Sequence, residues 1–346
     1  MDLKCPVKAR EGDFIESVDG LIFDVKGLVH PPDRIIAYVR YVESSMGNRV
    51  RGDRRYLKVY SLSERENLLR SRYPHYIHYN EVFGEWLESV PLNLAVKHYQ
   101  PIQKTMEIFK GDQQDKVKAD LRDFIEELHD ATSISVGNIG VSGSVLVDLH
   151  TTNSDIDIII YGRNNCITAY NELRLLLSER RRGFSPFDRD DLKNLYNFRS
   201  RDTLMPFKEF CFHESRKAFQ GKFHGRAFFV RFVVDWSEID ERYGDRTYRD
   251  VGYARIKAVI EDDSNSIFTP CSYRIFNVKV LEGKCNERLL DEIVSFRGRF
   301  CDQARKGESI IAQGKVERVI GRDGSEHYRI VLGNQPSDFM IIEGIS

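Results

Sequence analysis

The pattern of apolar and polar positions divides the chain into three regions. Up to about residue 105, the runs GLIFDVKGLV and RIIAYVRYVE alternate in polarity on either side of a turn at HPPD, residues 30–33. Such alternation is typical of half-buried strands. From about 106 to 240, helical spacing and short apolar runs follow one another, and from about 241 the alternation returns. We therefore expect three domains, over residues 1–105, 106–240 and 241–346.

The middle region predicts helices and strands in succession. Within QDKVKADLRDFIEELHDA the apolar positions recur at helical spacing, which predicts an amphipathic helix buried through Val117, Leu121, Phe124, Ile125 and Leu128. A strand ending in IGVSGS, a brief helix over SVLVDLH, an apolar strand and a helix from about 165 to 182 are expected next. RAFFVRFVVDW then predicts a further buried strand. This order favours an α/β unit.

The C-terminal region predicts mainly strands. YARIKAVIEDD and SYRIFNVKVLEG alternate, and GRDG at 321–324 is a strong hairpin turn. Between these strands and that turn, ERLLDEIVSFRGRF predicts a helix. The fold class expected for the whole chain is α+β, a small mixed-sheet core with helices, flanked by two mainly-β regions.

Composition narrows the class of protein. The 346 residues are 41% hydrophobic and 30% charged, which is ordinary for a soluble globular protein. Apolar runs fall short of the roughly 20 residues of a membrane helix, and the N-terminus has no secretory signal, so we expect a cytoplasmic protein with no membrane partner. A net charge of −1 restricts nucleic-acid binding to local patches. Six scattered cysteines without a C-x-x-C pair argue against a zinc module and a disulfide framework, and favour mostly buried thiols.

Two aspartates stand out within an apolar run. Asp155 and Asp157 flank Ile156 and precede Ile158–Ile160, so a strand would place both carboxylates on one face. Paired carboxylates repel each other, and their burial without a partner is costly. The commonest compensation is a divalent cation, so we expect a metal site here.

The residues before this pair carry a family resemblance. Gly143-Ser144 is followed, eleven residues after Ser144, by Asp155 in the run Ser-Asp-Ile-Asp. This resembles the signature of the DNA polymerase beta-like nucleotidyltransferase superfamily, in which a Gly-Ser pair begins a helix and an Asp-x-Asp lies on the next strand. The resemblance covers about a third of the chain, which looks like an archaeal-type predicted nucleotidyltransferase with extra domains.

The resemblance implies roles for individual residues. Gly143 and Ser144 would bind the nucleotide phosphates, while Asp155 and Asp157 would hold Mg²⁺ or Mn²⁺. A third acid on a later strand would bind the same metal and act as general base, and Asp235 at the end of VRFVVDW is the candidate. Glu209 and Asp240 are its alternatives.

The sequence departs from the family at two points. Asp148 stands where members often have a glycine, which weakens any inference about the nucleotide pocket. The long spacing to the third acid also implies an insertion between 163 and 225.

Two functions follow from these residues. The first is a metal-dependent nucleotidyltransferase that moves a nucleoside monophosphate from an NTP to an acceptor hydroxyl, with nucleic acid among the possible acceptors. The alternative is a non-catalytic nucleotide- or nucleic-acid-binding module on the same fold. Asp235 beside the Asp pair would favour the enzyme, and an apolar neighbour would favour the binding module.

Other polar motifs carry weaker hypotheses. The arginine runs at 178–183 and 193–201 are either phosphate contacts or solvated helix ends. His75 and His78 within YPHYIHY are more typical of a packed aromatic segment than of a metal site.

Overall fold

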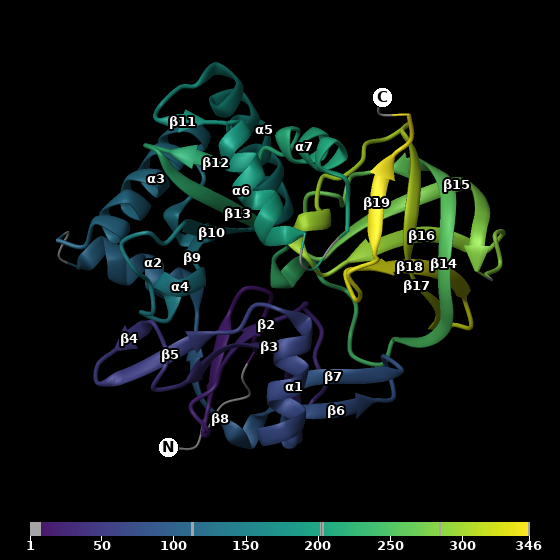
Figure 1. The fold of residues 1–346 in the computed structure, drawn as a ribbon, viewed down its shortest axis with the longest axis horizontal. Coiled ribbons are helices and arrows are strands. Elements are labelled where there is room, and N and C mark those ends of the chain that lie inside the picture. Colours follow the sequence, from purple (N-terminus) through teal and green to yellow (C-terminus); the bar gives the residue numbers. More distant parts are fainter. Residues whose placement is uncertain (1–7, 112–113, 201, 203, 284, 345–346) are drawn as a thin grey trace. The chain divides into compact units, whose positions relative to one another are not determined.

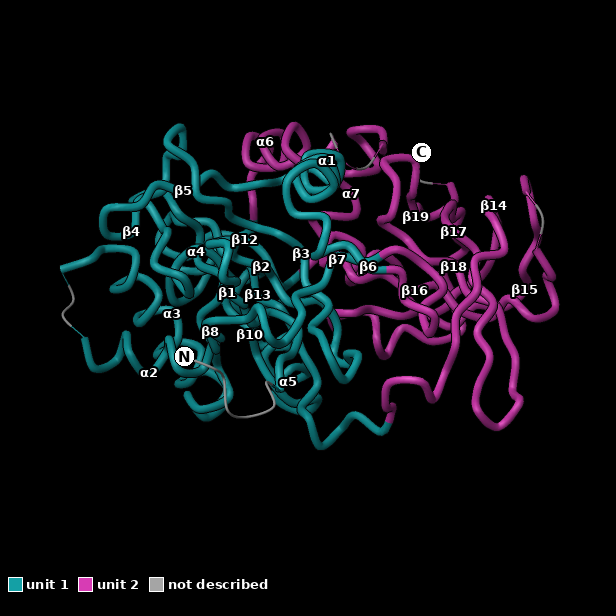
Figure 2. Tube along the Cα trace, turned by 90° about the horizontal axis from the view of Figure 1, so that it is seen from below, with its two compact units in different colours: residues 1–78, 87–186, 218–240 teal, residues 79–86, 187–217, 241–346 magenta. Residues whose placement is uncertain are grey.

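A computed structural model describes residues 8–111, 114–200, 202, 204–283 and 285–344. Helices and sheets, some of them mixed, occur along the chain, which confirms the expected α+β class (Figure 1). The chain forms two compact units, coloured separately in Figure 2. Unit 1 comprises residues 1–78, 87–186 and 218–240, and unit 2 comprises 79–86, 187–217 and 241–346.

The first part of unit 1 is an antiparallel sheet, here called the N-terminal sheet. Its strands run in the order β4-β5-β3-β2-β1-β8, with the turn at 30–33 between β2 and β3 as predicted. The elements of this region are β1 (Phe14–Ser17), β2 (Ile22–Val25), β3 (Arg34–Glu43), β4 (Arg49–Arg51), β5 (Arg54–Lys58), α1 (Leu62–Arg72), β6 (Ile77–Asn80), β7 (Glu85–Pro91) and β8 (Ala95–Tyr99). β7 pairs with β3 and β6.

The second part of unit 1 is a mixed sheet in the order β11-β12-β13-β10-β9, here called the central sheet. β10 runs parallel to β13 and antiparallel to β9. The helices α2, α3 and α5 pack against it (Figure 1). Its elements are α2 (Pro101–Lys110), α3 (Lys116–Thr132), β9 (Ile139–Val141), α4 (Gly143–Leu146), β10 (Ile156–Tyr161), α5 (Arg163–Glu179), β11 (Phe184–Ser185), β12 (Gln220–Phe223) and β13 (Arg226–Val233).

The helix predicted from QDKVKADLRDFIEELHDA is α3. Asp115 caps it by accepting hydrogen bonds from the backbone N–H groups of Val117 and Lys118. Its buried residues are the five that the periodicity selected. The helical period therefore determined which face packs into the core.

The N-terminal sheet contacts the segment after Gly143 through aromatic side chains. Tyr41, Tyr56 and Tyr99 of the N-terminal sheet are buried in one cluster with Leu146 and Val147, which follow Gly143. The N-terminal sheet therefore packs directly against the segment that carries the Gly-Ser motif.

Unit 2 contains a sheet that closes on itself. β14 pairs with β15 on one side and with β17 on the other, and the path continues through β16 and β18, which are parallel to each other. The predicted hairpin at 321–324 joins β17 to β18. Its elements are α6 (Arg189–Arg199), α7 (Phe207–Ser215), β14 (Arg246–Asp262), β15 (Cys271–Gly283), β16 (Leu290–Ser295), β17 (Ser309–Gly321), β18 (Glu326–Leu332) and β19 (Phe339–Ile342).

The helix predicted over ERLLDEIVSFRGRF is wrong, because β16 occupies its centre. Leu290, Ile293 and Val294 are buried there, and the strand pairs with β15 on one side and β18 on the other. Backbone pairing on both sides decided in favour of a strand, although the apolar spacing also fits a helix.

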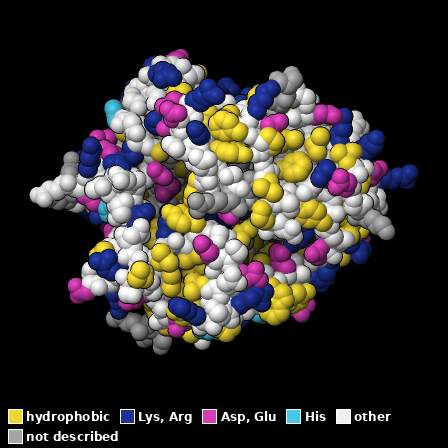
Figure 3. Space-filling model, viewed as in Figure 1, with side chains coloured by type: hydrophobic (Ala, Val, Ile, Leu, Met, Phe, Trp, Pro, Cys, Tyr) yellow, Lys and Arg dark blue, Asp and Glu magenta, His cyan; other side chains and the backbone are white. Residues whose placement is uncertain are grey.

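Short 3-10 helices connect several of these elements: η1 (Pro74–Tyr76), η2 (Leu92–Leu94), η3 (Val136–Asn138), η4 (Trp236–Glu238) and η5 (Gly298–Phe300). Among the described residues, no helix is long and apolar enough to cross a membrane. On the face that Figure 3 shows, acidic and basic side chains are interspersed, in keeping with the near-zero net charge.

The described cysteines are free thiols. Cys166, Cys271 and Cys301 are buried, whereas Cys211 and Cys285 are half-buried. Cys5 lies outside the described residues.

Candidate functional site

The Asp pair lies at the beginning of β10. Asp155 immediately precedes the strand and Asp157 is its second residue, so both side chains lie on one face. Ile156, Ile158 and Ile160 on the other face are buried in the core. Asp157 is half-buried, while Asp155 reaches solvent. The start of the strand thus presents two neighbouring carboxylates, of which that of Asp155 is open to solvent.

Gly143 is in direct contact with Asp157. Its backbone has φ of +61°, and a Cβ atom at this position would lie 1.9 Å from Oδ2 of Asp157. The backbone N–H of Ser142 donates to the carbonyl oxygen of Asp157 at 2.9 Å. Glycine is therefore required here both by the left-handed backbone and by the close approach of the carboxylate.

Ser144 is buried behind the pair. Its hydroxyl donates to Oγ of Ser154 at 3.2 Å, and Ser154 in turn accepts from the backbone N–H of Thr151 at 2.9 Å. α4 is a single turn of four residues. In this arrangement the Ser144 hydroxyl positions the loop that leads into Asp155.

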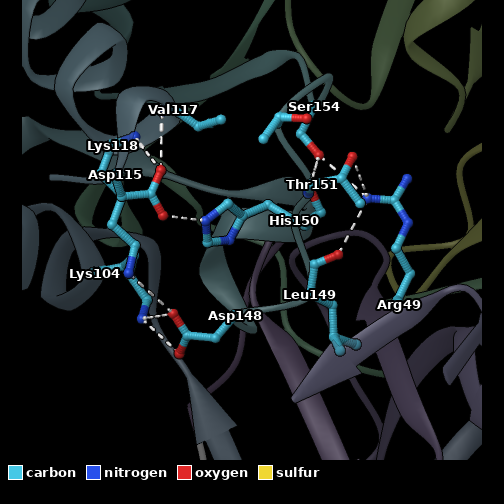
Figure 4. Close-up of polar contacts among 12 residues, drawn as sticks. Arg49, Lys104, Asp115, Val117, Lys118, Asp148, Leu149, His150, Thr151 and Ser154 are labelled. Atoms are coloured by element: carbon cyan, nitrogen blue, oxygen red, sulfur yellow. Dashed lines mark hydrogen bonds and ion pairs between the residues drawn. The ribbon is translucent and has the colours of Figure 1, made fainter. Parts of the chain in front are cut away.

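Arg49 of β4 reaches the same loop from the N-terminal sheet. Its Nη1 donates to the carbonyl oxygen of Leu149 at 3.2 Å, to Oγ1 of Thr151 at 3.4 Å and to Oγ of Ser154 at 3.2 Å (Figure 4). One guanidinium group thus holds three oxygens of the segment between α4 and β10.

Side chains of α2 and of the α3 cap hold the other side of that segment. Lys104 donates to both carboxylate oxygens of Asp148, at 3.1 and 3.0 Å, and Asp148 has φ of +53°. Nε2 of His150 lies 2.6 Å from Oδ2 of Asp115 (Figure 4). The loop before the Asp pair is therefore fixed from two sides.

Basic side chains surround the pair in what we call the charged cluster. Electrostatic attraction acts on Asp155 from Lys58, Arg226 and Arg49, and on Asp157 from Lys58, Arg231 and Arg40. The members of the charged cluster are Asp155 and Asp157 with Arg40 of β3, Arg49 of β4, Lys58 of β5, and Arg226 and Arg231 of β13.

The attraction of these cations does not fully offset the cost of burying the two carboxylates. Desolvation, followed by the charge of Asp157, raises the pKa of Asp155 to about 6. Desolvation also raises the pKa of Asp157. Both carboxylates are thus held where their ionised forms are disfavoured, and an added cation would stabilise those forms.

Lys58 and Arg40 are the least satisfied cations of the cluster. Desolvation, together with the positive charges of Arg40 and Arg49, lowers the pKa of Lys58 to about 8. Neither Lys58 nor Arg40 forms an ion pair within the described part of the chain. Both lie over the ring of Tyr60, with Lys58 Nζ at 4.9 Å and Arg40 Cζ at 5.7 Å from its centroid. An anion would therefore find two available positive charges here.

Asp235 is not part of this cluster. In the register of the parallel strands Asp157 lies beside Phe229, and Asp235 follows six residues further along the chain, two residues beyond the end of β13. At about 3.3 Å per residue this separation is roughly 20 Å. The prediction that Asp235 shares a metal with the pair is corrected accordingly.

Asp235 has a local structural role instead. Its Oδ1 accepts from the backbone N–H of Ser237 at 3.2 Å, and Glu238 accepts from the backbone N–H of Asp235 at 2.8 Å. This reciprocal pattern is a capping box at the start of η4. Oδ2 also lies 3.6 Å from Nη1 of Arg10.

Among the described residues, β13 contributes no third carboxylate beside the pair. Phe229 is the direct neighbour of Asp157, and Arg231 lies on the same face two residues later. No group of three or more His, Cys, Asp or Glu side chains that could hold a metal occurs among the described residues. Of the two alternatives, Glu209 lies on α7 in unit 2, and Asp240 lies beyond Asp235.

A third carboxylate, which is itself buried, approaches the pair from β2. Asp24 is 7% exposed, and its charge contributes to the raised pKa of Asp157. It forms ion pairs with Lys26 at 3.0 Å and with Arg231 at 3.8 Å. Desolvation opposes ionisation of Asp24, but the neighbouring cations hold its pKa below the ordinary value.

A separate cavity of about 460 Å³ lies at the β4–β5 hairpin of unit 1. None of the predicted site residues lines it. It is lined by equal numbers of acidic and basic side chains together with Tyr99 and Gly52, namely Glu16, Arg51, Gly52, Asp53, Arg54, Lys97, Tyr99 and Asp148.

Arginines of both runs pair with carboxylates. In unit 1, Arg181 lies 2.6 Å from Glu179, and Arg182 lies 2.6 Å from Glu127, at the exposed end of α5. In unit 2, Arg199 pairs with Glu214, and Arg201 lies outside the described residues. These pairs favour the interpretation as solvated or structural arginines over that of phosphate contacts.

His75 of the segment YPHYIHY makes packing and hydrogen-bond contacts, as a packed aromatic segment would. Nε2 of His75 lies 3.0 Å from Oδ2 of Asp19, and its ring packs on that of Tyr76.

Comparison with known proteins shows a relative that matches nearly the whole chain. The chain is 29% identical over 349 residues to an uncharacterized protein of Methanocaldococcus jannaschii, and the match spans 96% of this chain and 98% of the relative. No family model and no solved structure matches the chain. The similarity extends across both compact units.

Proposed function

We propose that the charged cluster binds the polyphosphate of a nucleoside triphosphate together with a divalent cation held by Asp155 and Asp157. The observation that supports this most is the convergence of cations from the N-terminal sheet on two carboxylates at the start of β10. Mg²⁺ favours sites of one or two carboxylates completed by substrate phosphates. The resemblance to the nucleotidyltransferase superfamily points to the same ligand.

Each part of the site has a physical task in this proposal. The divalent cation relieves the repulsion between Asp155 and Asp157, which accounts for a pair that is otherwise unfavourable. Lys58 and Arg40, without carboxylate partners in the described residues, neutralise phosphate oxygens. Gly143 leaves room for the carboxylate of Asp157 at the backbone.

Binding without turnover is the function that the strand neighbours favour. In the superfamily that the sequence resembles, the third acid lies on a strand of the same sheet, but here Phe229 and Arg231 stand beside and beyond Asp157 on β13. A guanidinium group attracts phosphate but does not accept a proton from an acceptor hydroxyl, because it stays protonated.

Nucleotidyl transfer is the second candidate function, and Asp24 is the observation that favours it. This carboxylate is buried and within electrostatic range of Asp157, and its Oδ1 has no hydrogen-bond partner. A shift of the Lys26 and Arg231 side chains onto bound phosphate would free Asp24 for the metal.

Calorimetric titration tests the binding proposal. The full chain is titrated with the four common NTPs and with tripolyphosphate, each with and without Mg²⁺. We expect metal-dependent binding that Lys58→Ala weakens about tenfold, or about 1.4 kcal/mol, because a charge-assisted contact is lost. Lys193→Ala, at an exposed lysine of α6, is the matched control and keeps the affinity of the unmodified chain. Absence of metal-dependent binding, or equal weakening by both variants, contradicts the proposal.

Incubation with labelled NTP and a panel of RNA, DNA, protein and small-molecule acceptors separates the two functions. The binding module predicts no label on any acceptor. Transfer that is lost in Asp24→Asn and retained in Asp235→Asn establishes the second candidate in its place.

A further inference from the structure

An exposed aromatic ring stands next to the unpaired cations of the charged cluster. Tyr60 follows Lys58 by two residues, just beyond the end of β5, and is 39% exposed. Lys58 lies over this ring at 4.9 Å and Arg40 at 5.7 Å. The same two cations act electrostatically on Asp157. One pair of cations thus connects an exposed ring with the carboxylates.

We infer that Tyr60 is the stacking surface for the nucleobase of the bound nucleotide. This inference rests on the proposed function, because it uses the same cations as phosphate ligands. A nucleotide has an anionic part and a flat aromatic part joined by a sugar, and the structure places cations and an exposed ring side by side in the same way. When Lys58 and Arg40 bind phosphate, their charged groups move away from the ring of Tyr60. The exposed part of the ring then faces the base.

Stacking on a tyrosine also determines the class of ligand. Every base has a π face, so a stacked ring accepts all four bases, with preferences that follow stacking strength. The site is therefore a general nucleoside triphosphate site in which purines bind more tightly than pyrimidines. Inorganic tripolyphosphate reaches the same cations without the contribution of the base.

Calorimetric titrations of the full chain with ATP, CTP and tripolyphosphate, all in Mg²⁺, separate the two parts of the ligand. We expect ATP to bind about tenfold or more tightly than tripolyphosphate. Tyr60→Leu removes this advantage and leaves the tripolyphosphate affinity unchanged, whereas Tyr60→Trp retains the advantage. Tyr79→Leu is the matched control, since Tyr79 is also 39% exposed but belongs to the β6 strand.

The outcomes distinguish this inference from the proposed function. If tripolyphosphate binds as tightly as ATP, or if Tyr60→Leu keeps the advantage of ATP, the role of Tyr60 is refuted while the phosphate site stands. If neither ligand binds, the proposed function and this inference both fail.

Discussion

The beginning of β10 and the end of β13 both place carboxylates at the edge of an apolar strand, but they do so in different physical situations. Asp157 faces Gly143 across a contact too close for a Cβ atom, and its pKa is raised by desolvation. Asp235 accepts a hydrogen bond from the backbone of η4 and lies beside Arg10. The ionised form of Asp157 is disfavoured at its position. The carboxylate of Asp235, by contrast, accepts a hydrogen bond that the backbone N–H of Ser237 needs.

The difference shows which of the two is a candidate for function. Groups whose ionised form is disfavoured by their position tend to occur at binding and catalytic sites, because the ligand supplies what the protein lacks. A capping aspartate needs no ligand, since its hydrogen bonds already account for its position. The comparison therefore favours the pair at the start of β10 as the metal site that we propose, and gives Asp235 a structural role.

The contact at Gly143 gives the largest expected effect on stability. Gly143→Ala and Gly52→Ala introduce a Cβ atom at similar backbone angles, φ of +61° and +59°, but only residue 143 has atoms of Asp157 in the way. Both variants carry a left-handed strain of about 1–2 kcal/mol. We expect Gly143→Ala to lose about 1–3 kcal/mol more, through overpacking.

Urea denaturation of both variants measures this difference. Equal losses of stability in the two variants would show that the carboxylate moves aside without cost, and that the close packing of Asp157 has no energetic importance.

Arg49 gives the next largest effect. Arg49→Ala removes one donor from three oxygens of the loop before Asp155, so we expect a loss of about 1–3 kcal/mol in the free energy of unfolding. Arg55→Ala on the neighbouring strand removes a single part-buried contact, with the carbonyl oxygen of Gly47, and serves as the control. A thermal unfolding scan compares them, and a control as unstable as Arg49→Ala would contradict the assigned role.

Loss of the Asp235 cap has a smaller effect. We expect Asp235→Ala to destabilise the chain by about 1 kcal/mol, as is usual for an N-cap, and to leave metal and nucleotide affinity unchanged. Calorimetry with Mg²⁺ and ATP on this variant checks the second part. A tenfold weaker affinity for Mg²⁺ or ATP would show that Asp235 belongs to the binding site after all.

The pH dependence of stability is the smallest effect. The pKa of Asp155 is about 6 in the folded chain, above its ordinary value of 3.8. Its stabilising contribution is therefore fully present below about pH 4 and is lost as the pH rises through about 6. In metal-free buffer, the melting temperature of the unmodified chain should decline relative to Asp155→Asn over this range, and added Mg²⁺ should reduce the decline. Parallel pH curves for the two proteins would contradict the raised pKa.

Local patterns in the sequence predicted part of this fold and site. The periodicity of α3, the apolar runs of β10 and β13, and the turn at 321–324 each carry their own signal, and each is present in the structure. The shared face of Asp155 and Asp157 follows directly from the two-residue repeat of a strand. β16 was missed because its apolar spacing fits a helix as well as a strand, and pairing with distant strands decided between them.

The remainder of the site depends on packing between distant segments. Arg40, Arg49 and Lys58 reach the Asp pair from about a hundred residues earlier in the chain, and nothing local in the sequence shows that the two sheets meet. The alternation of Arg49 and Arg51 places both arginines on one face of β4, but of these two only Arg49 belongs to the charged cluster. The role of Asp235 was visible, because Asp235 and Glu238 in DWSE match the spacing of a capping box.

Direct measurement of Mn²⁺ binding tests the central claim that Asp155 and Asp157, rather than Asp235, hold the divalent cation. Electron paramagnetic resonance reports free Mn²⁺ during titration of the unmodified chain and of Asp155→Asn, Asp157→Asn and Asp235→Asn, each in the presence of ATP. We predict that the unmodified chain and Asp235→Asn bind Mn²⁺ equally, while each variant of the pair binds at least about tenfold more weakly, which corresponds to about 1.4 kcal/mol. Undiminished Mn²⁺ binding by both Asp155→Asn and Asp157→Asn, or loss of binding in Asp235→Asn, would contradict the account.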